Sequence, residues 1–190
     1  MNGADKSMLP LGGKPLLQHV IARAAPQVDE LLLSANGDPA RFTAFGRTVI
    51  ADHEAGYFGP IAGILSGFKW AKQNRAGAKW LISFACDCPF LPRDLVVRLL
   101  DGAEQADVPV AVAGSGRRHH PVFTAWSMSL PLSWAEILHV RALRAADHLI
   151  EMFPNTRVEF PDIPIDPFFN INTPDDLARA EVLVAEYAGV

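Results

Sequence analysis

The sequence predicts an α/β protein built on a mainly parallel β-sheet that helices cover on both faces. Short apolar runs of strand length alternate along the chain with longer segments of helical periodicity. The chain has 190 residues, of which 49% are hydrophobic and 20% charged, which suits one domain with a sizeable core. There is no internal repeat or low-complexity segment. We therefore treat residues 1–190 as a single domain.

The elements follow in order from local signals. Pro15 suits the first position of a helix, and apolar residues at helical spacing continue that helix to residue 25. Gly59-Pro60 opens a second helix. Thr173 is a capping residue, because Pro174 and two carboxylates follow it in the first turn of the last helix. The expected strands are 30–34, 48–51, 79–85, 108–113, 122–126 and, at an edge, 157–160. The expected helices are 15–25, 60–73, 92–105, 132–139, 141–152 and the segment after 173, with an irregular loop over 161–167.

Composition argues against several classes of protein. The net charge is −4, whereas proteins that bind a nucleic-acid backbone usually carry a basic surplus. No apolar stretch reaches the roughly 18 residues of a membrane span, and the N-terminus lacks the basic-then-apolar pattern of a secretion signal. The two cysteines are one residue apart and cannot join distant elements. We expect a cytoplasmic protein that binds neither nucleic acid nor membrane.

Polar residues follow several of the expected strands. In open α/β sheets, ligands bind beyond the carboxyl ends of the strands. Four segments meet that description: Ser34-Ala-Asn-Gly37, Ala51-Asp-His-Glu54, Cys86-Asp-Cys88 and Asn170-Ile-Asn172. If they share one edge of the sheet, they form one cleft.

The Cys86-Asp87-Cys88 segment raises the question of which side chain carries chemistry. Two thiols alone do not complete a zinc site, which usually has four ligands, so inert packing is favoured for the cysteines. Asp87 ends an apolar strand, where a carboxylate is costly unless it is paired. A hard cation such as Mg²⁺ is one suitable partner, and a helix cap or a loop ion pair is the alternative.

Four motifs occur in a fixed order that is specific as a set: Gly3-Ala-Asp-Lys-Ser-Met-Leu-Pro-Leu-Gly-Gly-Lys-Pro-Leu-Leu17, Gly59-Pro-Ile-Ala-Gly63, Cys86-Asp-Cys-Pro89 and Asn170-Ile-Asn-Thr-Pro-Asp-Asp176. With them, nearly the whole chain resembles the molybdenum cofactor guanylyltransferases, a MobA-like nucleotidyltransferase family. The resemblance implies a three-layer α/β/α, Rossmann-like fold. It also implies a Mg²⁺-dependent transfer of GMP from GTP to molybdopterin, which releases pyrophosphate and forms the guanine dinucleotide cofactor.

The resemblance also implies roles for individual residues. Lys6 matches the lysine that holds the nucleotide phosphates, and Asp87 matches the metal-binding aspartate; both are the catalytic candidates. Asn36 and Asp52 match nucleotide-contacting residues. The implied partners are GTP and molybdopterin, with molybdoenzymes or other cofactor-biosynthesis proteins as further candidates. Gly59–Gly63 matches a turn beside the base and ribose, and Asn170 and Asn172 match residues near the pterin phosphate and the metal.

The chain departs from the family pattern at its beginning. Family members start with an apolar strand and a Leu-Ala-Gly-Gly loop that ends in an Arg-Met pair, and the match here begins at the methionine of that pair. We therefore expect a domain that is N-terminally incomplete relative to the family, through either a late start or truncation. The strands near 31–33 and 80–84 would then lack a pairing partner.

Two rival functions remain open from the sequence. One is a related enzyme that uses CTP or acts on a sugar or phospho-acid. The other is a non-catalytic module that binds nucleotide or pterin. The segment Arg117-Arg-His-His120 is either a solvated hairpin or a phosphate or pterin contact, and Pro121 matches a His-Pro position of the family.

Overall fold

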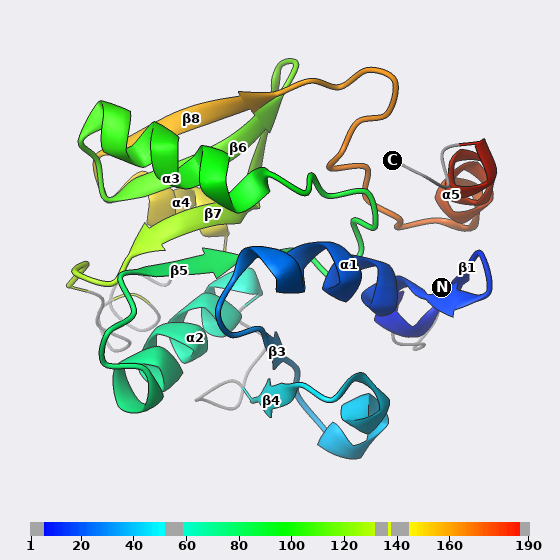
Figure 1. The fold of residues 1–190 in the computed structure, drawn as a ribbon, viewed down its shortest axis with the longest axis horizontal. Coiled ribbons are helices and arrows are strands. Elements are labelled where there is room, and N and C mark those ends of the chain that lie inside the picture. Colours follow the sequence, from blue (N-terminus) through cyan, green and yellow to red (C-terminus); the bar gives the residue numbers. More distant parts are fainter. Residues whose placement is uncertain (1–5, 52–58, 132–136, 138–144, 187–190) are drawn as a thin grey trace.

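The computed structural model describes residues 6–51, 59–131, 137 and 145–186 (Figure 1). Its α-helices are α1 (Leu16–Ala24), α2 (Pro60–Asn74), α3 (Leu95–Ala106), α4 (Ala146–Ile150) and α5 (Pro174–Glu186), and 3-10 segments lie at Lys6–Met8, Ala25–Gln27 and Pro39–Phe45. Its strands are β1 (Pro10–Leu11), β2 (Lys14–Pro15), β3 (Leu32–Ser34), β4 (Thr48–Ile50), β5 (Trp80–Ser83), β6 (Val110–Ser115), β7 (Arg118–Ser127) and β8 (Asn155–Phe160). Within these ranges, no helix combines the length and apolar character that crossing a bilayer requires.

The main sheet has four strands in the order β5-β7-β6-β8, and β3 and β4 form a separate parallel pair. Side chains of β6 alternate between two apolar layers, as the pleat of a strand requires. Val110 and Val112 pack with α2 and α4. Ala111 and Ala113 pack with α3 on the other face. The two faces are therefore both covered by helices, which confirms the three-layer α/β/α architecture (Figure 1).

The main sheet is mixed, so the expectation of a mainly parallel sheet was wrong for these four strands. β7 runs antiparallel to β5 and to β6, and only the β6–β8 pair is parallel. The cause is a tight turn: β6 ends at Ser115 and β7 starts at Arg118, with Gly116 between them at a positive φ of 54°. A connection this short joins antiparallel strands, whereas a parallel pair needs a long crossover.

The register of this hairpin shifts between Val112 and Ala113. Val112 pairs with Thr124, whereas Ala113 pairs with His120, so the intervening residues of β7 bulge out of the ladder. Pro121 lies in the bulge, where its missing N–H breaks no ladder bond. The expected strands 108–113 and 122–126 ended short of this region, but the hairpin that was one alternative for Arg117–His120 is present and is longer than expected.

The other expected elements agree with the structure to within a few residues. The helices after residues 15, 60, 92 and 173 are α1, α2, α3 and α5, and β8 is an edge strand as expected. The segment 161–167 has no helix or strand. The helix expected over 132–139 lies outside the described residues except for Ile137, and that over 141–152 is described only from 145, where it includes α4.

Helix α2 packs against both β3 and β5. Two of its glycines, one turn apart, allow the close approach. A Cβ atom on Gly63 would lie 2.9 Å from Oγ of Ser34 in β3, and a Cβ on Gly67 would lie 3.2 Å from Cδ1 of Leu81 in β5. Larger residues at these positions would push the helix away from one strand or the other.

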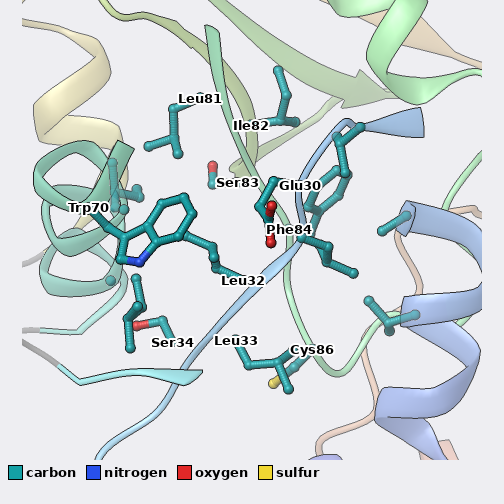
Figure 2. A pocket seen from close by; sticks show the side chains of 18 of the residues that line it. Glu30, Leu32, Leu33, Ser34, Trp70, Leu81, Ile82, Ser83, Phe84 and Cys86 are labelled. Carbon is teal, nitrogen blue, oxygen red and sulfur yellow. The ribbon is translucent and has the colours of Figure 1, made fainter. Parts of the chain in front are cut away.

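A cavity of about 1300 Å³ lies between β3 and β5, lined by residues 28–36 on one side and 77–87 on the other. It exceeds the roughly 300–1,000 Å³ of small-molecule pockets. Figure 2 shows side chains of both strands and Trp70 of α2 gathered around this space. Among the described strands, β3 pairs only with β4 and β5 only with β7, so each has an edge without a strand partner toward the cavity. Apolar side chains such as Leu81 and Ile82 are only partly buried there.

We expect an apolar strand and glycine-rich loop added upstream of Met1 to stabilise the chain. The strand would pair with the open edges of β3 and β5 and would cover their apolar side chains. Burial of two or three such side chains should raise the melting temperature by about 5 °C or more.

The matched control carries the same loop after a glycine-serine segment of the same length in place of the strand. Both forms are compared with the 190-residue chain by differential scanning calorimetry. Equal melting temperatures for the apolar and glycine-serine extensions would show that the cavity between β3 and β5 does not accept a strand.

Candidate functional site

Of the residues predicted to bind a nucleotide, Asn36 and Asp87 line the cavity, whereas Lys6 is not among its lining residues. Asn36 follows β3, Asp87 follows β5, and Gly59 and Gly63 belong to the start of α2; all four line the cavity. The expectation that separate strand ends share one cleft is therefore confirmed for residues 34–36 and 86–87 of the first and third of the four segments along the sheet edges. Asp52, in the second segment, lies outside the described residues.

Asp87 is half-buried where the chain leaves β5. Burial raises the pKa of its carboxyl above the usual range, and the nearby Lys6 ammonium and the residue's own backbone N–H oppose this shift. The carboxylate is therefore poorly solvated, which is the situation in which a cation is most strongly attracted. Its backbone carbonyl accepts a hydrogen bond of 3.0 Å from the N–H of Ile171.

Lys6 lies between this carboxylate and the segment before α5. Its Nζ donates to Oδ1 of Asn172 at 2.8 Å. Its positive charge opposes the rise in the pKa of Asp87 that burial causes. Ile171, next to Asn172, is fully buried and bonded to Asp87. The fourth predicted segment, Asn170-Ile-Asn172, is thus joined to the same site. The structure brings together Lys6, Asp87 and Asn172 from three distant parts of the sequence.

The capping motif that follows fixes the start of α5. Oγ1 of Thr173 accepts from the backbone N–H of Asp176 at 3.1 Å, and the Asp176 carboxylate accepts from the N–H of Thr173 at 2.9 Å. A further bond of 3.1 Å comes from the N–H of Asn172. Hydrogen bonds from the Thr173 side chain and from these two N–H groups hold the pKa of Asp176 below its usual value. The backbone of Asn172 is therefore held by the helix that follows it.

The two thiols differ in environment. Cys86 is exposed, whereas Cys88 is buried and its Sγ lies 3.6 Å from the carbonyl oxygen of Phe168. Burial, with the nearby Asp87 carboxylate, raises the pKa of the Cys88 thiol far above its ordinary value. A thiol that stays protonated at neutral pH is a poor nucleophile. The described residues contain no cluster of three or more His, Cys, Asp or Glu side chains suited to a metal.

Arg41 is a cavity residue that sequence reasoning missed. It lies in the 3-10 segment Pro39–Phe45, and its Nη2 donates to the carbonyl oxygen of Asn36 at 2.6 Å. Asp38 starts this segment by accepting a bond of 2.9 Å from the N–H of Ala40. The pair Asp38-Pro39 is a recognisable helix start, and it was the available signal for the short segment that carries Arg41.

The start of α2 completes this end of the cavity. Gly59 adopts a positive φ of 62°, which favours glycine, and leads directly into Pro60 at the first helical position. Both residues line the cavity. The first turn of a helix has backbone N–H groups without helical partners, and its dipole favours an anion.

Comparison with known proteins agrees with this geometry. Residues 1–153 match the model of the MobA-like NTP transferase domain. The molybdenum cofactor guanylyltransferase of Nitrobacter hamburgensis is 45% identical over 185 residues, which cover 97% of this chain and 88% of that protein. A molybdenum cofactor guanylyltransferase of Rhodopseudomonas palustris is 46% identical over 181 residues, covering 95% of this chain and 86% of the relative.

Solved structures support the fold. Molybdopterin-guanine dinucleotide biosynthesis protein A from Archaeoglobus fulgidus superposes with a TM-score of 0.72 at 23% identity, covering 97% of this chain and 92% of that one. The 2-C-methyl-D-erythritol 4-phosphate cytidylyltransferase of Thermus thermophilus superposes with a TM-score of 0.63 at 20% identity, covering 95% and 94%. The sequence matches carry the more specific conclusion: this chain belongs to the MobA-like NTP transferases, the nucleotidyltransferase family that includes the molybdenum cofactor guanylyltransferases.

Proposed function

We propose that this protein transfers GMP from GTP to molybdopterin and releases pyrophosphate. The observation that carries the proposal is the meeting of Lys6 and Asn172 with Asp87, a residue that lines a large cavity, in a chain 45% identical to a molybdenum cofactor guanylyltransferase. In the reaction, an oxygen of the pterin's terminal phosphate attacks the α-phosphorus of GTP. The bond from that phosphorus to the β-phosphate oxygen breaks, and pyrophosphate leaves.

The chain's own residues bind and orient the two substrates. Lys6 neutralises negative charge on the nucleotide phosphates, and Asn36 contacts the nucleotide at the end of β3. We retain Asp52 as a nucleotide contact on the ground of the family resemblance alone. Asn170 and Asn172 face the pterin phosphate. Phosphoryl transfer is mainly positioning and charge neutralisation, so no protein nucleophile is needed.

Asp87 is the residue suited to hold Mg²⁺. Burial leaves its carboxylate poorly solvated and so raises its pKa. A hard cation prefers carboxylate and phosphate oxygens as ligands. Since the described residues offer no cluster of three acidic, histidine or cysteine ligands, phosphate oxygens and water would complete the coordination. When bound, Mg²⁺ supplies charge neutralisation on the phosphates.

The function is tested by incubating the protein with molybdopterin, Mg²⁺ and each of GTP, CTP and ATP. We expect the guanine dinucleotide and pyrophosphate with GTP, and much less product with the other two. A thermal-shift series with the same nucleotides should give its largest gain with GTP. A larger gain and faster transfer with CTP would assign the protein to cytidylyl transfer, and binding without pyrophosphate release would identify a non-catalytic module.

Replacement of the Asp87 charge should separate activity from stability. The Asp87→Asn variant keeps the size of the side chain but cannot hold Mg²⁺ in the same way. We expect guanylyl transfer to fall by about a hundredfold or more. Asp94→Asn is a matched control, because Asp94 is exposed and forms an ion pair with Arg98 on the surface of α3. Near-normal transfer by the Asp87→Asn variant would refute the metal-binding assignment.

The Asp87→Asn variant should become more stable relative to the wild type as the pH rises. In the folded wild type the pKa of Asp87 is raised, so the folded state binds more protons than the unfolded state between the ordinary carboxyl pKa and the raised value. The free energy of unfolding of the wild type therefore falls as the pH rises through that window, and Asp87→Asn removes this loss. Urea titrations in metal-free buffer, at about three pH values between pH 4 and neutral pH, measure the free energy of unfolding of both proteins. The variant should become more stable relative to the wild type as the pH rises. The opposite trend would show that Lys6 and the backbone N–H outweigh burial.

A further inference from the structure

The connection between β8 and α5 carries the asparagines assigned to the acceptor substrate. It spans residues 161–173 and has no helix or strand of its own. Figure 1 shows it in orange, running from the end of β8 across to α5. A long irregular segment holds its side chains in place only where specific contacts fix its backbone.

Asp166 makes a concentrated set of such contacts. Its Oδ1 accepts from Oγ of Ser115 at 3.1 Å and from the backbone N–H of Phe168 at 3.0 Å. Its Oδ2 forms an ion pair with the guanidinium of Arg118. Ser115 and Arg118 are the last residue of β6 and the first of β7, so one carboxylate joins the connection to both sides of the hairpin turn.

His120 supports the serine. Its Nε2 lies 2.7 Å from Oγ of Ser115. Because the serine hydroxyl donates to Asp166, it accepts from His120, which assigns the hydrogen on the neutral ring to Nε2. Burial lowers the pKa of His120, although the charge of Asp166 acts in the opposite direction. Because the pKa is lowered, the ring is neutral at pH 7. Its ring also stacks on that of Phe168 with 4.3 Å between centroids.

Beyond Asp166, the connection is held against the site itself. Phe168 is only 2% exposed and packs with Phe123 and Phe160 in the core under α3. Three residues later, the N–H of Ile171 bonds to the carbonyl oxygen of Asp87 at 3.0 Å. Asn170 lies between these two anchors, and Asn172 follows the second.

We propose that Asp166 is a positioning residue for the acceptor substrate: it ties the 161–173 connection to the β6–β7 hairpin and so holds Asn170 and Asn172 beside Asp87. The inference rests on the proposed guanylyl transfer and extends it to a residue that touches neither nucleotide nor reacting atoms. The cavity that receives the nucleotide is lined by β3, β5 and α2, and neither Asp166 nor its hairpin partners line it. Loss of the clamp should therefore weaken binding of molybdopterin and leave GTP binding nearly unchanged.

The test uses steady-state kinetics of the full chain with each substrate varied in turn. Asp166→Ala removes every bond of the carboxylate, and we expect the KM for molybdopterin to rise on the order of tenfold. The KM for GTP should change by less than about threefold. Asp166→Asn keeps an acceptor oxygen for Ser115 and Phe168 but loses the charge that faces Arg118. It should therefore rescue most of the effect and match Arg118→Ala, which removes the same ion pair from the other side.

Asp162→Ala is the matched control, since Asp162 is an exposed aspartate of the same connection. It should leave both KM values at the wild-type level. Hydrogen exchange at the Ile171 N–H gives a readout that does not depend on turnover, and exchange should accelerate in Asp166→Ala but not in Asp162→Ala. Equal increases in both KM values, or an unchanged KM for molybdopterin in Asp166→Ala, would overturn the proposal.

Two further outcomes are informative. If Asp166→Ala does not fold, Asp166→Asn and Arg118→Ala take its place. Each removes only the ion pair, so a smaller rise in the KM for molybdopterin with an unchanged KM for GTP would support the proposal, and no rise at all would overturn it. If the wild-type protein binds GTP but transfers nothing to molybdopterin, the proposed function fails and so does the acceptor role. The clamp itself is then judged by hydrogen exchange alone, so the two failures are distinguished.

Discussion

The close approach of helix α2 to both β3 and β5 is the constraint on which the rest of the structure depends. β3 and β4 share no strand pairing with the main sheet among the described strands, and α2 packs against β3 on one side and β5 on the other. Gly63 and Gly67 make this possible, since side chains there would collide with Ser34 and Leu81. The same helix contributes Ile61, Ile64, Leu65 and Phe68 to the core beneath β6 and β7. Its packing therefore sets the spacing of the two strands whose ends form the site.

The geometry of the site follows from placing charge at the border of this core. Burial removes water from the carboxylate of Asp87, and the two residues that follow it, Cys88 and Pro89, are buried as well. Such a group costs free energy in the folded state unless a cation is near, and Lys6 supplies only part of that compensation. The chain keeps the residue in place through its main chain, by the bond from Ile171, and leaves its side chain available toward the cavity. A site of this kind is less stable alone than with bound metal and phosphate.

The sequence was a good guide where the signals are local. The helix caps at Pro15, Gly59-Pro60 and Thr173 placed three helices correctly, and the rule of strand ends brought Asn36 and Asp87 into one cavity. It was a poor guide where contacts between distant residues decide. Asp166 contacts Ser115 and Arg118, which lie about fifty positions earlier in the sequence. The spacing of these residues does not predict the contacts.

Arg157 shows a related limit. Its guanidinium lies over Gly114, where an added Cβ would be 2.1 Å from Nε, and Nη2 donates to the carbonyl oxygen of Gly116 at 2.7 Å. A glycine in the middle of a buried strand would ordinarily weaken it. Here the absence of a side chain makes room for an arginine from β8, which packs on the hairpin next to Asp166's partners. The role of Gly114 is therefore evident only from the three-dimensional arrangement of β6 and β8.

The tryptophans of the cavity give this protein a built-in optical reporter. Trp70 of α2 (Figure 2) and Trp80 of β5 both line the space between β3 and β5, and both are partly exposed, whereas Trp126 is fully buried in the core. An indole in contact with water emits at longer wavelength and is quenched by small solutes such as acrylamide, and an enclosed one is protected from both. Filling of the space between the strands will therefore move the emission toward the blue and reduce quenching, while the signal of Trp126 stays constant as an internal reference.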